Sequence, residues 1–324
     1  MRTTVLTGTG LRVSSVCLGT MTFGSQVSEP EAAQMVDYAL DRGVNFLDTA
    51  NVYNAGLSEE ITGRVLGKRR SRVILATKVR GNMGEGTGAY GGLGRPAVRR
   101  ACEESLRRLG TDYIDIYYLH QPDRAVEIEE TLATLEDLRA EGKIRWIGTS
   151  NFAAWQMAEI AAISATSAYQ APAVAQPMYN VLARDVEQEY VEFTRRYRVA
   201  NVCYNPLAGG LLSGKQSLGR GPLPGTRFDG NQMYLRRYWH TQYFRAVSAL
   251  KTAADGMGIP LAEFALRWIC NREGAECVIL GASRLGHLQQ NIAASQEDPL
   301  PSEALEACDV AWQELRGPIP QYNR

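Results

Sequence analysis

The sequence is poor in histidine and has no paired cysteines. Its three histidines, His120, His240 and His287, form no H-x-H or H-E-x-x-H pattern, whereas a metallohydrolase usually needs several imidazoles that converge on one ion. Its six cysteines include no C-x-x-C pair, which argues against both a disulfide framework and a zinc knuckle. We therefore predict no metal site and expect reduced, mostly buried thiols.

Long apolar runs and an excess of one charge are also missing. No stretch approaches the ~18 apolar residues of a membrane span, and the segment MRTTVLTGTGLRV contains no long apolar core of a signal peptide. The formal net charge is zero and 45% of the residues are hydrophobic, so we expect binding to neither nucleic acid nor a membrane. The sequence predicts a cytoplasmic protein with a small-molecule partner, and both a monomer and a homo-oligomer stay open.

Short, β-rich apolar runs recur along the chain. They cover residues 16–20, 44–49, 73–78, 113–120, 144–150, 173–176, 200–206 and 277–283. From the second to the seventh, their starts lie 27 to 40 residues apart, which suits a strand, a helix and two loops. Near-continuously apolar strands indicate a parallel sheet covered on both faces, either doubly wound or closed. The number of runs favours an α/β fold of the (β/α)8 TIM barrel type, as one domain over residues 1–324.

The remaining segments have signals of their own. Ser28 and Glu31 fit a capping box that opens a helix, and Gly43 suits its end. The opening TTVLTGTGLRVS reads as a β-hairpin that would plug the bottom of the barrel. The stretch between the seventh and eighth runs is long and rich in Gly, Pro, Tyr and Arg, and loops of this length are more often functional than idle.

Polar residues close seven consecutive runs. In a barrel the carboxyl ends of all strands open onto one face, so these residues predict a site there. They are Asp48, Lys78, His120, Ser150 with Asn151, Gln176, Tyr204, and Ser283 with Arg284. Each has an ordinary alternative: Asp48 as a cap, Lys78 as a snorkelling lysine, His120 as a core imidazole, Ser150 and Asn151 as a helix N-cap, and Tyr204 as core. Their joint placement favours the site.

Three of these loops bring together the four parts of a general acid. A tyrosine hydroxyl such as Tyr53 has an ordinary pKa near ~10 and needs a neighbouring cation to favour its ionised form. Lys78 would be that cation, Asp48 would hold its ammonium, and His120 would orient a carbonyl or share its proton. The set suits a carbonyl oxygen that becomes an alkoxide.

No side chain is an evident hydride donor, so a cofactor must supply the electrons. Ser150, Asn151 and Gln176 suit a carboxamide, and Tyr204 suits stacking on a nicotinamide ring. The eighth run ends in GASR, where backbone N–H groups, Ser283 and Arg284 would receive a phosphate. These features predict NADP.

The motifs FLDTANVY, LATK, YYLHQPD, GTSNF, QPMYN, CYNPLAGGLLSGK and GASRLGHLQQN, in this order, resemble those of the aldo-keto reductases over nearly the whole chain. The resemblance implies a (β/α)8 barrel that reduces aldehydes and ketones with NADPH, NADH being the less expected cofactor. It implies a catalytic tetrad of Asp48, Tyr53 as proton donor, Lys78 and His120. Its implied cofactor contacts are Ser150, Asn151, Gln176, Tyr204, Leu207, Gly209, Leu211, Lys215, Arg227, Gly281, Ser283, Arg284, Gln290 and Asn291. Two positions depart from the family pattern: His287 stands where relatives usually have Gln, and Gln290 stands where they often have Glu.

The substrate is less defined by the resemblance. YYLHQPD, MYN, RFDGNQMY, RRYW and PQYNR are similar to the aflatoxin-aldehyde reductase branch, which also handles succinic semialdehyde and other dicarbonyls, whereas GNMGEGTGAYGGLGR is nearer to keto-sugar reductases of bacterial natural-product pathways. Expected pocket residues are Met21, Met83, Tyr90, Arg237 and Trp239, with Arg236 beside them.

Three rival readings remain. A class I aldolase would use Lys78 as a Schiff base, although Asp48 would keep that lysine charged. A regulatory redox-sensing barrel would resemble the β subunits of voltage-gated potassium channels, but no feature marks a channel-binding surface. A short-chain dehydrogenase would need a Tyr-x-x-x-Lys pair and a glycine fingerprint, neither of which is present.

Overall fold

The computed structural model describes residues 1–84 and 90–319. Residues 85–89 of the stretch GNMGEGTGAYGGLGR, and the ending QYNR with Pro320 before it, lie outside the described residues.

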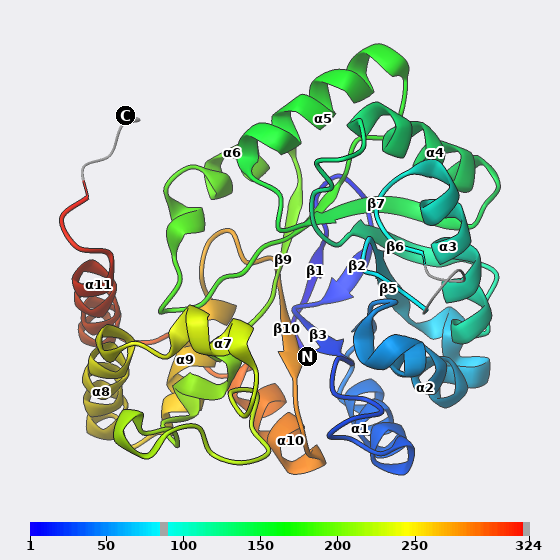
Figure 1. Cartoon of the computed structure of the whole chain (residues 1–324). Helices are drawn as coiled ribbons and strands as arrows, with labels where there is room; N and C mark the ends of the chain where they lie inside the picture. Colours follow the sequence, from blue (N-terminus) through cyan, green and yellow to red (C-terminus); the bar gives the residue numbers. More distant parts are fainter. Residues whose placement is uncertain (85–89, 320–324) are drawn as a thin grey trace.

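The described residues contain a closed barrel of eight parallel strands (Figure 1). Its order around the barrel is β10-β3-β4-β5-β6-β7-β8-β9. The strands are β3 (Val16–Gly19), β4 (Phe46–Asp48), β5 (Ile74–Val79), β6 (Ile114–Leu119), β7 (Ile144–Ser150), β8 (Val174–Gln176), β9 (Ala200–Cys203) and β10 (Cys277–Gly281). Each strand overlaps one of the predicted apolar runs. The predicted (β/α)8 barrel is confirmed.

The opening segment forms the predicted hairpin. Strands β1 (Thr3–Val5) and β2 (Arg12–Ser14) pair antiparallel, with Thr4 opposite Val13. Leu6 and Val13 are fully buried and pack with Cys17 of β3 and Phe46 of β4 inside the barrel. The hairpin therefore closes the end of the barrel at which the strands begin.

Helices surround the barrel (Figure 1). They are α1 (Glu29–Asp41), α2 (Leu57–Leu66), α3 (Arg95–Leu109), α4 (Ile128–Ala140), α5 (Ala154–Ser167), α6 (Tyr190–Tyr197), α7 (Gln232–Tyr238), α8 (Thr241–Gly256), α9 (Leu261–Cys270), α10 (Leu285–Ala294) and α11 (Ser302–Arg316). The long stretch between β9 and β10 thus contains α7, α8 and α9, and α8 packs against α11.

The predicted capping box of α1 forms only by half. The Ser28 hydroxyl accepts from the backbone N–H of Glu31 at 3.5 Å. The Glu31 carboxylate instead accepts from the backbone N–H of Leu285, at the start of α10. A tertiary contact between two helices has displaced the local one.

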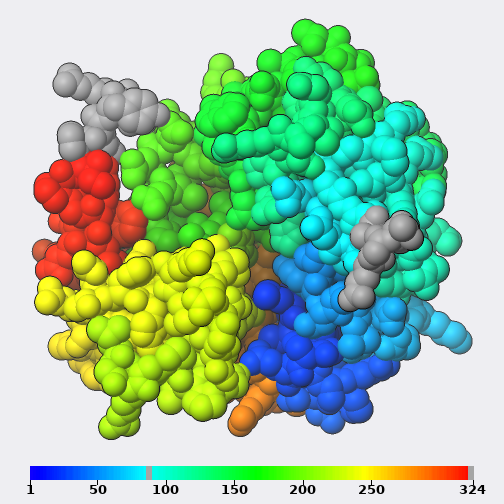
Figure 2. All heavy atoms as spheres, in the orientation of Figure 1, coloured from blue at the N-terminus to red at the C-terminus, as the bar shows by residue number. Residues whose placement is uncertain are grey.

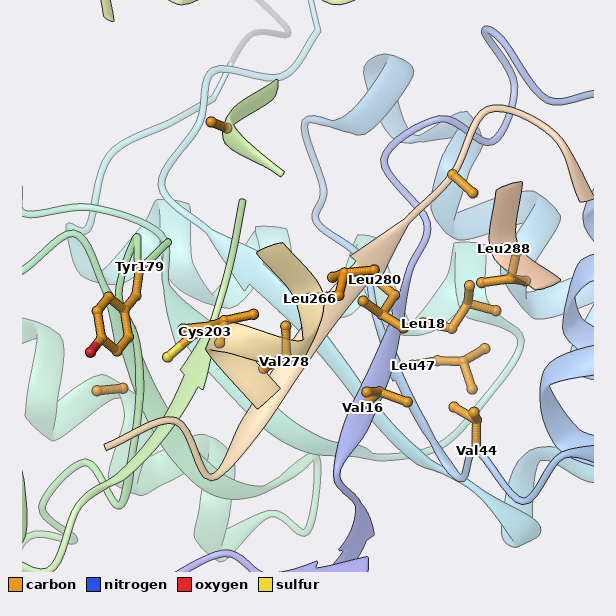
Figure 3. Close-up of a cluster of buried hydrophobic side chains, with 14 of the residues drawn as sticks. Val16, Leu18, Val44, Leu47, Tyr179, Cys203, Leu266, Val278, Leu280 and Leu288 are labelled. Atoms are coloured by element: carbon orange, nitrogen blue, oxygen red, sulfur yellow. The ribbon is translucent and has the colours of Figure 1, made fainter. Parts of the chain in front are cut away.

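Alternation along the strands separates two apolar layers. Val16 and Leu18 of β3, Leu47 of β4, and Val278 and Leu280 of β10 face outward and pack against residues such as Leu266 of α9 and Leu288 of α10 (Figure 3). Cys17, Phe46, Ala76, Tyr118, Val174 and Val202 belong to a second cluster that fills the barrel. Successive side chains of a strand point to opposite faces, which explains the division.

The same alternation places the polar strand ends over the barrel interior. Asp48 lies two residues after Phe46, Lys78 two after Ala76, and His120 two after Tyr118, each preceding residue being in the inner cluster. Gln176 follows Val174, and Tyr204 follows Val202, in the same way. Side chains from separate strands thus meet above the inner core. Among the described residues, no helix is both long and apolar enough to cross a membrane.

Candidate active site

A buried ion pair lies at the centre of the carboxyl-terminal rim. Lys78 is fully buried and Asp48 is 3% exposed, and the Lys78 ammonium donates to Asp48 Oδ1 at 2.5 Å and to the Thr49 carbonyl at 2.6 Å. Burial lowers the pKa of Lys78, but the charge of Asp48 offsets this and the net pKa is raised above 10.5. Burial raises the pKa of Asp48, and the charge of Lys78 and the hydrogen bonds from Lys78 and Gln176 to its two oxygens offset this only in part. Lys78 is therefore a fixed cation at neutral pH.

Tyr53 stands beside that cation. It begins the 3₁₀ turn η1 (Tyr53–Gly56), and the Lys78 ammonium donates to its hydroxyl at 3.3 Å. Burial raises the pKa of Tyr53 above 10, and the Lys78 charge opposes this only in part. The expected cation is in place, but desolvation of the phenolate outweighs it in this structure. Tyr53 consequently keeps its proton at neutral pH, as a proton donor must.

His120 completes the group from the end of β6. Its ring lies edge-on to that of Tyr53, with the centroids 6.0 Å apart and the planes at 80°. Burial, and then the Lys78 charge, lower the pKa of His120 to about 3. Neither ring nitrogen has a hydrogen-bond partner among the described residues. A neutral imidazole is thus available to a ligand.

A chain of hydrogen bonds connects this group to β7, β8 and β9. Gln176 donates to Asp48 Oδ2 at 2.8 Å, and the Ser150 hydroxyl donates to the Gln176 carbonyl at 2.9 Å. The Asn151 amide donates to the His120 carbonyl at 2.9 Å and accepts from the Tyr204 hydroxyl at 2.7 Å. With the Lys78–Asp48 bond and the bond from the Asn151 amide to the Ser150 hydroxyl, the six strand ends from β4 to β9 are therefore held in one network. The alternative that Ser150 and Asn151 cap the next helix is wrong, because Ala153 is the N-cap of α5 and Asn151 has φ 61°.

The loop after β9 has an unusual backbone. Asn205, Ala208, Gly209 and Gly210 have φ values of 64°, 49°, 69° and 99°, all in the left-handed region. No heavy atom lies within 4 Å of the position that a Cβ on Gly210 would take. The turn exposes main chain at the rim, next to the predicted contacts Leu207, Leu211 and Lys215. Of these contacts, Leu211 is buried and Lys215 is exposed. Such an open glycine backbone can receive a ligand closely.

Basic residues gather on the side of β10. Arg227 donates to the Tyr234 hydroxyl at 3.2 Å and lies 3.3 Å from the place of a Cβ on Gly281, and its charge slightly opposes the rise in the pKa of Tyr53 that burial causes. Lys215 and Arg284 lie within electrostatic reach of His287, and after burial they contribute to lowering its pKa.

The other predicted adenosine-side residues lie on the same helix end. The Ser283 hydroxyl lies 3.4 Å from His287 Nδ1. On α10, Gln290 is exposed and Asn291 is buried. The α10 start is partly occupied, because Glu31 accepts from the Leu285 N–H. Sequence reasoning did not foresee this acidic contact.

The predicted pocket residues lie in separate surroundings. Met83 and Tyr90 pair through two backbone hydrogen bonds of 2.7 and 2.9 Å. Arg237 lies close enough to Tyr204 to lower its pKa, although burial raises that pKa overall. Trp239 packs on Phe228 and Phe244 within the β9–β10 stretch. Met21 is 38% exposed and Arg236 is exposed.

The surface is hollowed beside the β9–β10 stretch. Figure 2 shows a recess between the segment that carries α7 and α8, coloured yellow, and the blue and cyan segments of the N-terminal half.

Within the described residues, no cluster of His, Cys, Asp and Glu could hold a metal ion.

Comparison with known proteins identifies the family. Residues 15–313 match the model of the aldo/keto reductase family. The chain belongs to the aldo/keto reductase family. It is an oxidoreductase that acts on carbonyl groups. Membership of this family supports carbonyl reduction with a nicotinamide cofactor.

Several relatives match this aldo/keto reductase over nearly its full length. Human "Aflatoxin B1 aldehyde reductase member 2" is 38% identical and covers 97% of this chain and 90% of the relative. Human "Aldo-keto reductase family 7 member A3" is 36% identical and covers 95% and 96%. A "Probable voltage-gated potassium channel subunit beta" of Arabidopsis thaliana is 35% identical and covers 90% of each. The resemblance to the aflatoxin-aldehyde reductase branch is confirmed.

The sequence reasoning missed two supports of the site in this aldo/keto reductase. The Tyr238 hydroxyl of α7 accepts from the side-chain amides of Asn180 and Asn205, at 3.1 and 2.8 Å, which fixes the β9–β10 stretch to the rim. A buried ion pair between Glu59 and Arg108 lies behind η1. The motif MYN, which contains Asn180, was the available signal for the first. The Glu59–Arg108 pair had no signal in the sequence, because charged residues on helices are usually solvated.

The neutrality of His120 gives a testable result. The His120 ring should show no titration between pH 5 and 8 in NMR spectra of labelled histidine, because its pKa is lowered to about 3. With three histidines in the chain, His120→Gln assigns the resonance. Protonation of this group favours the unfolded chain, so its contribution to stability is lost as pH falls from about 6.5 towards about 3. An inflection of the His120 resonance near pH 6.5 would contradict this account.

Proposed function

We propose that the protein reduces an aldehyde or ketone to an alcohol with NADPH, with Tyr53 as the proton donor. The observation that carries this proposal is the contact of the Tyr53 hydroxyl with an ammonium that Asp48 keeps charged. When bound, the nicotinamide cofactor supplies the hydride.

The side chains of the site would manage the proton. Tyr53 is protonated at neutral pH, as an ordinary phenol is, and burial raises its pKa further. As a substrate oxygen gains negative charge, the O–H of Tyr53 donates to it, and the Lys78 ammonium stabilises the tyrosinate that remains. Asp48 stays ionised and holds Lys78 in place through a 2.5 Å hydrogen bond. No solvent reorganisation is needed, because these partners are already set.

His120 would orient the substrate. Its neutral ring, edge-on to Tyr53, can donate one N–H to the same carbonyl oxygen. The charge of Lys78 nearby contributes to keeping the imidazole neutral. Tyr53 and His120 would thereby fix the carbonyl oxygen from two sides, which sets the reacting carbon in position.

The rim has features that fit a phosphorylated nicotinamide cofactor. The open backbone at Gly210 suits the close approach of a pyrophosphate. Lys215, Arg227 and Arg284 bring three cations to the same side of the barrel, which suits an additional 2′-phosphate. Ser150 and Asn151 would hold the carboxamide beneath the Tyr204 ring, and Gln176 would anchor them, since its carbonyl accepts from Ser150 and its amide donates to Asp48. Gln290 and Asn291 would lie at the adenosine end.

The buried environment of Lys78 disfavours the aldolase alternative. A Schiff-base lysine must lose its proton to attack a carbonyl. The Lys78 ammonium donates to Asp48, Thr49 and Tyr53, and its pKa is raised. A Schiff base leaves the lysine nitrogen with at most one N–H, so its formation would break at least two of these three contacts.

Turnover of different carbonyl compounds distinguishes the candidate substrates from one another and from a regulatory role. The relatives named as aflatoxin B1 aldehyde reductases favour an aldehyde or dicarbonyl, and a keto-sugar is the alternative. A panel of these three classes, followed by NADPH oxidation, would identify the preferred one. Tight NADPH binding without turnover of any class would favour a redox-sensing role like that suggested by the name of the plant relative.

The role of Tyr53 is tested by Tyr53→Phe. We expect kcat for carbonyl reduction to fall by at least about 10²-fold, the lower range for a lost general acid. NADPH affinity, measured by quenching of protein fluorescence, should stay within about twofold, since the phenyl ring keeps its packing. Tyr197→Phe is the matched control, because Tyr197 is 51% exposed on α6. Turnover retained in Tyr53→Phe would refute the proposed proton donor.

The choice of cofactor is tested by Arg284→Met. Removing one cation should weaken NADPH binding about tenfold, or about 1.4 kcal/mol. NADH binding should not change, because NADH has no 2′-phosphate. The control is Arg195→Met, an arginine that is 68% exposed and paired with Glu273 on another face. Equal affinity of the unaltered protein for NADPH and NADH would contradict the assignment.

A further inference from the structure

A second buried ion pair lies directly behind the catalytic loop. The guanidinium of Arg108, on α3, donates to Glu59 Oε2, on α2, at 2.7 Å. Their side chains are 6% and 0% exposed. Most other ion pairs of the described residues have partners that are substantially exposed. Two charges without water are costly, so the structure must provide them with specific partners.

The Glu59 carboxylate also holds strand β5. Its second oxygen, Oε1, accepts from the Thr77 hydroxyl at 2.5 Å. Thr77 directly precedes Lys78, and its side chain points outward from the barrel while that of Lys78 points inward. One carboxylate therefore joins the strand that carries Lys78 to the helix that follows Tyr53.

Arg108 in turn supports the turn that presents Tyr53. The three residues after Tyr53 have left-handed φ values, 50° at Asn54, 55° at Ala55 and 96° at Gly56. A Cβ on Gly56 would stand 2.8 Å from Cδ of Arg108, so the arginine stem lies against this backbone. Non-glycine residues in this region are strained and persist only where their surroundings hold them.

The other anchor of the turn lies on the opposite side. The Asn54 amide donates to the carbonyls of Met21 and Phe23 at 3.1 and 2.6 Å. The turn is therefore held between the loop after β3 and the Arg108 stem. Loss of the Arg108 contact would leave one side of the strained turn without support.

We propose that the Glu59–Arg108 pair is a positioning device that sets the Tyr53 hydroxyl against the Lys78 ammonium. This role rests on the proposed function of Tyr53. Neither Glu59 nor Arg108 touches the reacting atoms, so both act through the turn and through Thr77. The 3.3 Å contact between Lys78 and Tyr53 is the geometry that they maintain.

Stability alone is a poor explanation of the pair. Replacing a buried ion pair by apolar residues of similar size often leaves stability unchanged or raises it, whereas removing one partner strongly destabilises. This difference separates a positioning role from support of the fold.

The molecule also offers a comparison pair. Asp115, which is 1% exposed on β6, accepts from Arg70 at 2.8 Å and from the Leu75 N–H at 3.0 Å. These residues lie near the beginnings of β5 and β6, away from the catalytic rim.

The test compares Glu59→Gln, the double variant Glu59→Leu/Arg108→Met, and Asp115→Asn. We measure stability by urea unfolding, and kcat and KM for carbonyl reduction with saturating NADPH on folded protein. Glu59→Gln should lose stability and kcat together. The double apolar variant should regain stability while kcat stays about 10- to 100-fold low, because misplacement of a catalytic group by about 1 Å has this effect. KM should stay within about twofold. Asp115→Asn should lose stability and keep kcat.

Two outcomes would overturn the proposal. One is a double apolar variant that regains both stability and kcat, which would make the pair merely structural. The other is a change confined to KM, which would place the effect on substrate binding. If Glu59→Gln does not fold, Thr77→Val removes only the hydroxyl contact and should lower kcat in the same direction, and an unchanged kcat there would also contradict the proposal. Failure of the proposed function would appear separately, as turnover retained by Tyr53→Phe.

Discussion

The buried contact between Asp48 and Lys78 is the interaction on which the rest of the site depends. Both side chains lie almost without water at the top of an apolar barrel interior. A charge there is tolerated only when its hydrogen-bonding capacity is used. The Thr49 carbonyl, the Tyr53 hydroxyl and the Gln176 amide provide those partners. The electrostatic requirement of one ion pair thus fixes Tyr53, the proposed proton donor, and the neighbouring strand ends.

The network also explains why the residues proposed for the chemistry and for ligand contacts share one frame of hydrogen bonds. From Asp48 at the end of β4 it crosses the barrel to Gln176, and then passes through Ser150 and Asn151 to Tyr204, at the ends of the neighbouring strands β7, β8 and β9. A displacement of Asp48 would therefore move the groups proposed to hold the nicotinamide. The long stretch between β9 and β10 joins this frame through the Tyr238 hydroxyl. The proposed proton donor and the proposed cofactor contacts are consequently placed by the same set of hydrogen bonds.

Much of this could be predicted from residues alone, because strand alternation has a fixed period. Asp48, Lys78 and His120 each follow an inner-core residue by two positions, so their common direction was readable. What could not be predicted depends on tertiary partners. The donation from the Gln176 amide to Asp48 joins two strands that are far apart in the sequence. Glu31 leaves its own helix for α10. The pKa of Tyr53 follows burial more than the neighbouring charge, and burial is not visible in a sequence.

The central claim is that Asp48 keeps Lys78 charged, and the pKa of the Lys78 ammonium measures this directly. The chain has only five lysines, so side-chain NMR of labelled lysine can follow Lys78 in the unaltered protein and in Asp48→Asn. We predict that Lys78 titrates above 10.5 in the unaltered protein and well below that value in the variant, where burial acts without the opposing carboxylate. An unchanged Lys78 pKa in Asp48→Asn would contradict the account.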